Sequence, residues 1–160
     1  MTDARLEAKL GFDKIRTLIS DRCMTDYAAQ KVAGEEFSTD RSIIRMRLLL
    51  TDEMRLILMF EENFPTTGYI DAIPFLEPLQ KEGTSIDVLN LAKLKTVTDT
   101  TRRITHFFST VKDGVYPNLA RLAAPICTFP EVQRRIESIL DRYGDIKDSA
   151  SEALFEIRRD

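Results

Sequence analysis

The sequence is poor in the residues on which catalytic and metal sites depend. It contains no tryptophan, a single histidine and two cysteines. The cysteines, Cys23 and Cys127, are far apart and form no CxxC pair. Because a structural zinc site usually needs four nitrogen or sulfur ligands, we expect no zinc site. Both cysteines stand among apolar residues, which predicts buried, reduced thiols.

The motifs of common nucleotide-binding and hydrolytic enzymes are also missing. The chain has no GxxxxGK[ST] loop, no GxGxxG turn, and neither GxSxG nor HExxH. His106 falls within an expected helix, and the sequence identifies no nucleophile or carboxylate placed against it. We interpret it as a surface or partly buried histidine. We therefore predict that this chain is not an enzyme and has no catalytic, cofactor-binding or metal-binding residues.

Long hydrophobic runs are absent as well. No apolar run approaches the ~18 residues that a membrane span requires, and the N-terminus lacks the apolar core of a signal peptide. A formal net charge of -3 gives no general attraction to nucleic acid or to an anionic membrane. With 43% hydrophobic and 31% charged residues, the composition is that of an ordinary globular protein. We expect a cytoplasmic protein with no membrane partner.

Arginine doublets are the main exception to this even distribution of charge. Adjacent residues on a helix point about 100° apart, so a doublet does not present a flat face of two arginines. Guanidinium groups can bind phosphates, or they can pair with nearby glutamates such as Glu131, Glu137 and Glu156. The acidic overall balance favours ion pairing, and we predict little binding of duplex DNA by the isolated chain. The doublets are Arg102–Arg103, Arg134–Arg135 and Arg158–Arg159.

Apolar residues recur at spacings of three and four through nearly the whole chain, which predicts an all-α multihelical bundle. The long helix expected at 86–111 is apolar on several sides, as a central helix would be. Thr25 is expected to cap the second helix, and one of residues 38–40 to cap the third. Thr84 or Ser85 is expected to cap the helix at 86–111. The other helices are expected at about 12–23, 26–34, 41–62, 74–83, 116–125 and 130–143.

The last seventeen residues, GDIKDSASEALFEIRRD, predict the end of one helix and the start of another. Gly144 is a suitable residue for a helix stop. Ser149 and Glu152 have the spacing of a capping box, and Asp148 places a negative charge near the positive end of the helix. We therefore predict a helical domain at 1–148 and the first turns of a further helix at 149–160.

This C-terminal segment resembles a segment of the Smr-containing bacterial paralogues of MutS, the type-two MutS proteins. In that family a G-[DE]-[IV]-x-D-S-A-S-x-x-L-x-x-I-R pattern recurs. The matching residues are Gly144, Asp148, Ser149, Ala150, Ser151, Leu154, Ile157 and Arg158. The N-terminal stretch is similar to the family's opening pattern, L-x-F-x-K-I/V-x-x-L. There the matching residues are Leu10, Phe12, Lys14, Ile15 and Leu18.

The resemblance implies an amino-terminal fragment of a longer, dimeric protein. In that family such helices form the core or lever region, which joins a DNA-embracing clamp to an ATPase that uses ATP and Mg. The ATPase, the clamp and an Smr endonuclease-like domain would lie beyond residue 160 and would be partners of this chain. The parent is expected to act on branched DNA, suppressing recombination, or on stalled ribosomes. A stand-alone helical adaptor module is the alternative function, and an unrelated helical enzyme is a third.

Overall fold

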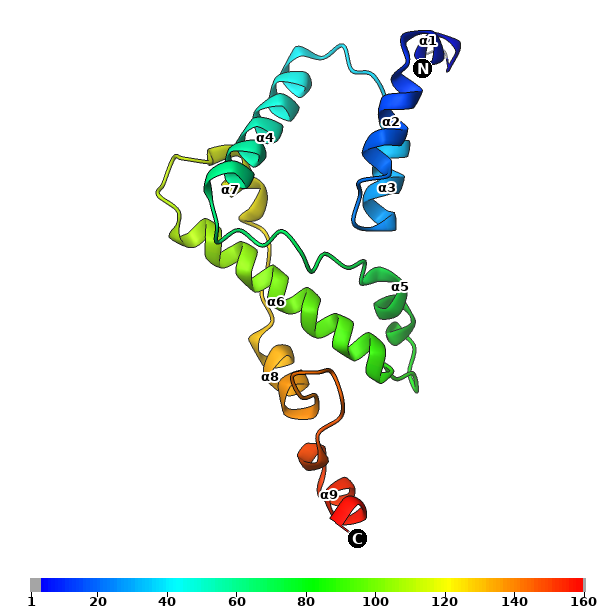
Figure 1. The fold of residues 1–160 in the computed structure, drawn as a ribbon, viewed down its shortest axis with the longest axis vertical. Helices are drawn as coiled ribbons and strands as arrows, with labels where there is room; N and C mark the ends of the chain where they lie inside the picture. Colours follow the sequence, from blue (N-terminus) through cyan, green and yellow to red (C-terminus); the bar gives the residue numbers. More distant parts are fainter. Residues whose placement is uncertain (1–3, 160) are drawn as a thin grey trace. The chain divides into compact units, whose positions relative to one another are not determined.

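The computed structural model describes residues 4–159, while residues 1–3 and Asp160, which fall within the predicted ranges 1–148 and 149–160, lie outside the described residues. Within the described part every regular element is a helix, which confirms the predicted all-α multihelical fold (Figure 1). No helix of that part is long and apolar enough to cross a membrane. The chain divides into two compact units, residues 1–62 with 113–122 and residues 63–112 with 123–160. The predicted boundary between 148 and 149 stays a prediction.

Unit 1 begins with short helices separated by local signals. Gly11 adopts a left-handed conformation, with φ of 72°, between α1 and α2. The Thr25 hydroxyl accepts a hydrogen bond from the Ala28 amide at 3.1 Å, so the predicted cap of α3 is confirmed. Asp40 is the residue of the 38–40 group that caps α4. The helices are α1 (Ala4–Leu10), α2 (Phe12–Ser20), α3 (Asp26–Ala33), α4 (Arg41–Phe60) and α7 (Pro117–Ala123), which runs one residue past this unit.

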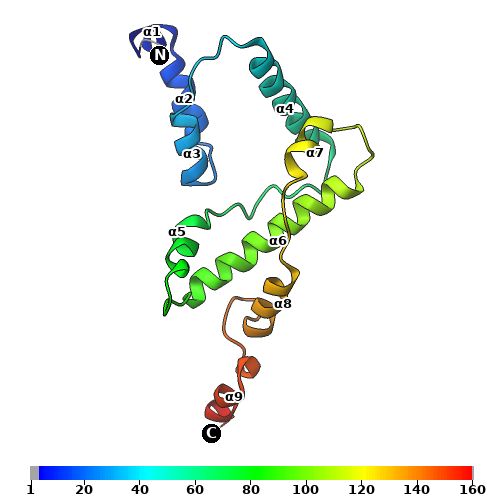
Figure 2. The same cartoon turned by 180° about the vertical axis from the view of Figure 1, so that it is seen from behind.

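Unit 2 is organised along its longest helix, α6 (Val88–Thr110), against which α8 (Pro130–Ile139) packs. Figure 2 shows the same helices from behind. Phe64 meets Phe107 edge to face, with the ring centroids 5.1 Å apart. Leu140 is fully buried and Ile136 is nearly so. The remaining elements are α5 (Ile73–Leu76), a 3-10 helix at Glu77–Gln80, a second at Asp148–Ala150, and α9 (Glu152–Arg159).

Three of the predicted helix boundaries in unit 2 are wrong. Asp87, not Thr84 or Ser85, caps α6, because its carboxylate accepts from the Asn90 amide at 2.8 Å. The Thr84 hydroxyl instead donates to the Lys81 carbonyl at 2.7 Å, within the preceding turn. The start of the C-terminal helix also differs: α9 begins at Glu152 rather than at Ser149.

The predicted helix stop at Gly144 is also wrong, because α8 ends at Ile139. The Asp141 carboxylate accepts from the amides of Tyr143, at 2.8 Å, and Asp145, at 3.0 Å. These bonds close a turn that a helix cannot contain. The chain then folds back, and the Lys147 amide donates to the Ile139 carbonyl at 2.8 Å. Gly144 supplies the positive φ, 90°, that this turn requires.

The capping box predicted from Ser149 and Glu152 does not form as expected. Ser149 lies in the 3-10 helix, and the hydroxyl of Ser151 accepts from the Leu154 amide at 3.2 Å. Ser151 is therefore the N-cap of α9. Arg158 forms an ion pair with Asp148, which folds the 3-10 helix against α9.

Candidate interaction surface

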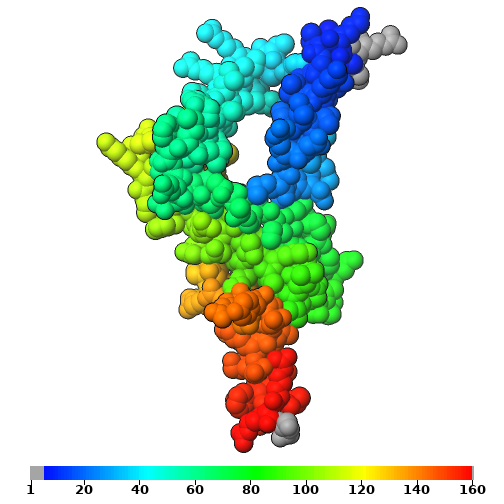
Figure 3. Space-filling view, viewed as in Figure 1, coloured from blue at the N-terminus to red at the C-terminus, as the bar shows by residue number. Residues whose placement is uncertain are grey.

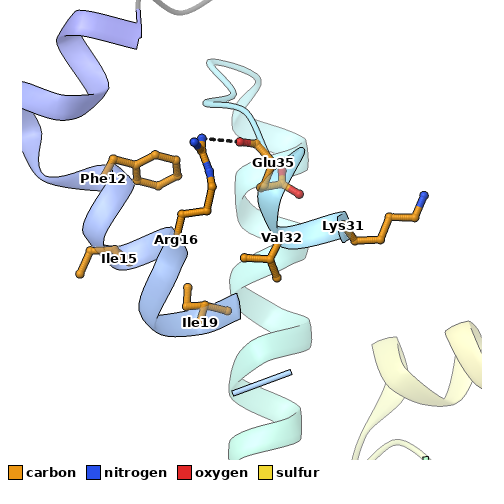
Figure 4. A pocket seen from close by; sticks show the side chains of 7 residues that line it. All are labelled: Phe12, Ile15, Arg16, Ile19, Lys31, Val32 and Glu35. Carbon is orange, nitrogen blue, oxygen red and sulfur yellow. Dashed lines mark hydrogen bonds between the residues drawn. The ribbon is translucent and has the colours of Figure 1, made fainter. Parts of the chain in front are cut away.

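Helices α2 and α3 pack side by side as a hairpin and enclose a hollow of about 200 Å³ (Figure 4). In the space-filling view these helices form one continuous surface, drawn in blue (Figure 3). Most of the lining is hydrocarbon. The lining residues are Phe12, Ile15, Arg16, Ile19, Lys31, Val32 and Glu35.

Arg16 is the polar centre of this hollow. Its Nη1 donates to Oε2 of Glu7 at 3.1 Å, and its Nη2 donates to the backbone carbonyl of Glu35 at 2.8 Å. The guanidinium carbon also lies 4.7 Å from the centroid of the Phe12 ring. The Nε atom is buried and has no hydrogen-bond partner among the described residues. One side chain thus ties α1, α2 and the segment after α3 together, since charge-assisted hydrogen bonds are the stronger ones.

The segment between α3 and α4 folds back on the hairpin. The Phe37 ring lies 4.3 Å from the Phe12 ring, centroid to centroid. Glu35 forms an ion pair with Arg47 of α4 through its side chain, while its carbonyl accepts from Arg16. These contacts hold one rim of the hollow in place.

Large apolar side chains remain exposed on the hairpin. Ile15, Leu18 and Ile19 of α2 are each about half exposed, at 51%, 51% and 50%. Met24 and Tyr27 continue the same kind of surface into α3. Single exposed apolar residues need no explanation, but a contiguous apolar patch marks an interaction site.

Helix α4 carries a second apolar surface along its C-terminal half. A hollow of about 540 Å³ is lined by Leu50, Thr51, Met54, Arg55, Leu58 and Met59. Leu58 is 59% exposed and Met59 60%. The two surfaces present helical faces of the kind that another amphipathic helix covers.

Another face of α4 carries a buried carboxylate. Glu53 is only 7% exposed. Its Oε2 accepts from the Leu119 amide at 2.8 Å, and its Oε1 accepts from the Asn118 side chain at 2.6 Å and from the Asn118 amide at 3.2 Å. Nearby, the Tyr116 hydroxyl donates to Oε1 of Glu61 at 2.9 Å. Burial, and then this hydrogen bond, raise the pKa of Tyr116.

The role of Glu53 was not predicted from the sequence. The position of Glu53 in the sequence of α4 nevertheless indicates that its side chain is buried. Met46, Leu50 and Ile57 form an apolar stripe with steps of four and seven, and Glu53 fills the gap between Leu50 and Ile57. A charged residue within an apolar stripe indicates a buried partner.

A third hollow, of about 310 Å³, lies between α6 and the turn after α8. Lys95 donates to the Asp141 carbonyl at 3.1 Å, which fastens the turn to α6. The Arg142 guanidinium lies 4.6 Å from the centroid of the exposed Tyr143 ring. Basic and acidic side chains alternate here, since Asp99 also lines the hollow, so it has no strong charge of either sign.

The arginine doublets form local ion pairs, as predicted, although the partners partly differ. Arg102 pairs with Asp99 and Arg158 pairs with Asp148, neither of which was expected. Arg134, rather than Arg135, pairs with Glu131. In each doublet one guanidinium is therefore engaged by a carboxylate of unit 2.

None of the lining residues of the three hollows is a histidine or a cysteine. His106 is exposed on α6, in agreement with the surface interpretation. Both cysteines are free, but Cys127 is exposed and Cys23 is half-buried, so the expectation of buried thiols is wrong. Among the described residues no group of three or more histidine, cysteine and acidic side chains is placed to hold a metal ion.

Taken with the fold, these surfaces describe an all-α scaffold that presents apolar helical faces. The chain is similar along almost its entire length to proteins named endonuclease MutS2. It is 27% identical over 159 residues to the one from Listeria monocytogenes, with 98% of this chain aligned. It is 29% identical to those of Leuconostoc mesenteroides, over 153 residues and 93% of the chain, and Symbiobacterium thermophilum, over 160 residues and 98%.

The predicted similarity to the type-two MutS proteins is thus confirmed. The chain spans about a fifth of the length of these curated relatives, at 20% or 19%. No protein-family model matches the chain.

Proposed function

We propose that this chain is a non-catalytic structural and mechanical domain of a MutS-like, ATP-dependent DNA-binding protein. The observation that carries the proposal is the pair of exposed apolar faces, on the α2–α3 hairpin and on α4. Helices from the remainder of a longer polypeptide would cover these faces. The similarity to a fifth of the length of the MutS2 relatives supports that source of partners.

A helical domain of this kind transmits rigid-body movement, because packed helices shift as units. ATP and Mg would bind elsewhere in the parent, whose activity on DNA or on stalled ribosomes would reach this domain as a change of geometry. We expect the parent to be a homodimer with an Smr endonuclease-like domain. None of these activities is assigned to residues of this chain.

The coding sequence beyond residue 160 provides the first test. We expect a P-loop and an Smr-like segment in the same reading frame. A reading frame that continues without either would overturn the proposal and favour the stand-alone adaptor, which uses the same apolar faces for a separate protein partner.

The surface itself can be tested by charge substitution in the longer protein. Ile15→Glu with Ile19→Glu should leave the helicity of the 160-residue chain unchanged, because both side chains are about half exposed. The same pair should lower the melting temperature of the longer protein, where burying unpaired charges is costly. Lys14→Glu, at an exposed position of the same helix, is the control. An unchanged melting temperature for the double variant would exclude this docking face.

Direct binding of nucleic acid by the chain is not part of the proposal. Arg102 is engaged by Asp99, and the net charge is -3. We expect little or no binding of duplex or branched DNA at physiological salt. Tight, salt-sensitive binding that is lost on replacing Arg102 and Arg103 would contradict this expectation.

A further inference from the structure

Helix α7 enters unit 1 as a short excursion of the chain. Residues 63–112 belong to unit 2, residues 113–122 to unit 1, and the chain is again part of unit 2 from residue 123. The excursion is therefore connected at both of its ends to unit 2. Whatever holds α7 on α4 determines whether this segment stays with unit 1.

The contact that holds it is centred on Glu53. Asn118 and Leu119, its donors, are the second and third residues of α7. Their amides belong to the group that a helix start leaves without partners inside the helix. The negative carboxylate also lies at the positive end of the helix. Figures 1 and 2 both show α7 beside the C-terminal half of α4.

A helix of seven residues is too short to be stable by itself in water. Its attachment must therefore come from contacts outside the helix itself, and its three hydrogen bonds to Glu53 of α4 are charge-assisted. None of the ion pairs formed among the described residues involves Glu53. The donors from α7 are thus what compensates the burial of this charge.

We propose that Glu53 is a latch that fastens the segment 113–122 to α4. With the latch closed, α7 moves with α4, and the covalent connections at 112–113 and 122–123 carry that movement to α6 and α8. With the latch open, the segment 113–122 detaches while α6 and α8 stay folded.

Hydrogen exchange on the full 160-residue chain tests the latch. Glu53→Gln keeps the shape of the side chain but removes its charge. We expect amides within 116–122 to exchange about ten- to a hundredfold faster in this variant, the range expected for lost hydrogen bonds to a charged group. Amides within 88–110 and 130–139 should keep their wild-type rates.

Two further variants separate the latch from a general loss of stability. Asp52→Asn changes the neighbouring carboxylate, which is exposed and pairs with Arg55 three residues on, and should leave every rate unchanged. Tyr116→Phe removes the hydrogen bond to Glu61. Amide exchange in the same segment should then become faster, but by a smaller factor than in Glu53→Gln. Unchanged exchange at 116–122 in Glu53→Gln would overturn the latch. Equal acceleration throughout α6 and α8 would also overturn it, since Glu53 would then stabilise the whole chain.

Discussion

Thr100 donates its hydroxyl hydrogen to the carbonyl oxygen of Gly68 at 3.1 Å, across 32 residues of sequence. The contact fastens the connection after α4 to the middle of α6. Gly68 has a φ of 85°, and a Cβ placed there would lie 2.5 Å from the Thr100 hydroxyl oxygen. The close approach of these two residues therefore needs glycine twice, for its backbone conformation and for its missing side chain.

Gly68→Ala should destabilise unit 2 through both effects. Backbone strain and overpacking together predict a loss of about 2–4 kcal/mol in the free energy of unfolding. Gly83→Ala is the matched control, because Gly83 has a similar φ of 79° but nothing within 4 Å of the added Cβ. Gly83→Ala should lower the free energy of unfolding only through backbone strain, by ~1–2 kcal/mol. Urea unfolding followed by circular dichroism measures both, and equal losses would show that the Thr100 contact is unimportant.

Two adjacent residues of α4 should respond very differently to truncation. Ile57 is fully buried, whereas Leu58 is 59% exposed. Ile57→Ala should lower the free energy of unfolding by about 2–5 kcal/mol, from lost burial and the cavity left behind. Leu58→Ala should change it by less than about 0.5 kcal/mol. Similar midpoints of thermal unfolding for the two variants would contradict the orientation of α4.

The two serines before α9 distinguish the observed cap from the one predicted from sequence. Ser151→Ala removes the acceptor for the Leu154 amide and should destabilise α9 by about 0.5–2 kcal/mol. Ser149→Ala should have little effect, because Ser149 lies in the preceding 3-10 helix. Amide exchange of residues 152–159 reports on this helix directly. Faster exchange in Ser149→Ala alone would restore the original capping-box interpretation.

Asp87 should make the stability of α6 depend on pH in acid. The backbone N–H of Asn90 donates to its carboxylate and holds the pKa of Asp87 below 3.8. Because the pKa in the folded chain is lowered, the stabilisation is complete above the ordinary pKa. It is lost as the pH falls through the lower, folded value. Asp87→Asn keeps a capping side chain without a titrating group, so its unfolding midpoint should fall less steeply than that of the wild type below about pH 4. Parallel pH profiles would exclude this role.

The helical fold could be predicted because most of its signals are local. Thr25 and Asp40 cap the helices that follow them, and apolar spacing locates α2, α4 and α6. The turn after α8 could not be predicted in the same way, because Tyr143 extends the helical spacing of Ile136 and Ile139 in the sequence. The Asp141 side chain decides the competition by accepting hydrogen bonds from the backbone amides of Tyr143 and Asp145. The pairing of Leu140 with Ile146 then completes the turn.

The surfaces were harder to predict than the helices. Exposed positions such as Ile15 and Leu58 look like core residues in a periodic sequence, because the pattern records which face is apolar and not what covers it. Glu53 shows the opposite difficulty, because its charged side chain looks exposed in the sequence but is buried against a partner in the structure. That partner is Leu119, 66 residues further along the chain, so no window of local sequence contains both.

The separation of 66 residues between Glu53 and Leu119 determines the order in which parts of the chain fold during synthesis. Residues 1–62 leave the ribosome first, yet unit 1 is not complete until residues 113–122 follow. Contacts between distant parts of a chain form late, because a long loop must close before they form. The Glu53 carboxylate therefore stays hydrated until α6 has been synthesised, and α4 cannot settle into its final packing before α7 arrives. Domains usually fold from the N-terminus as they emerge. In this chain the first unit is completed only after residues 63–112, which belong to the second unit, have been synthesised.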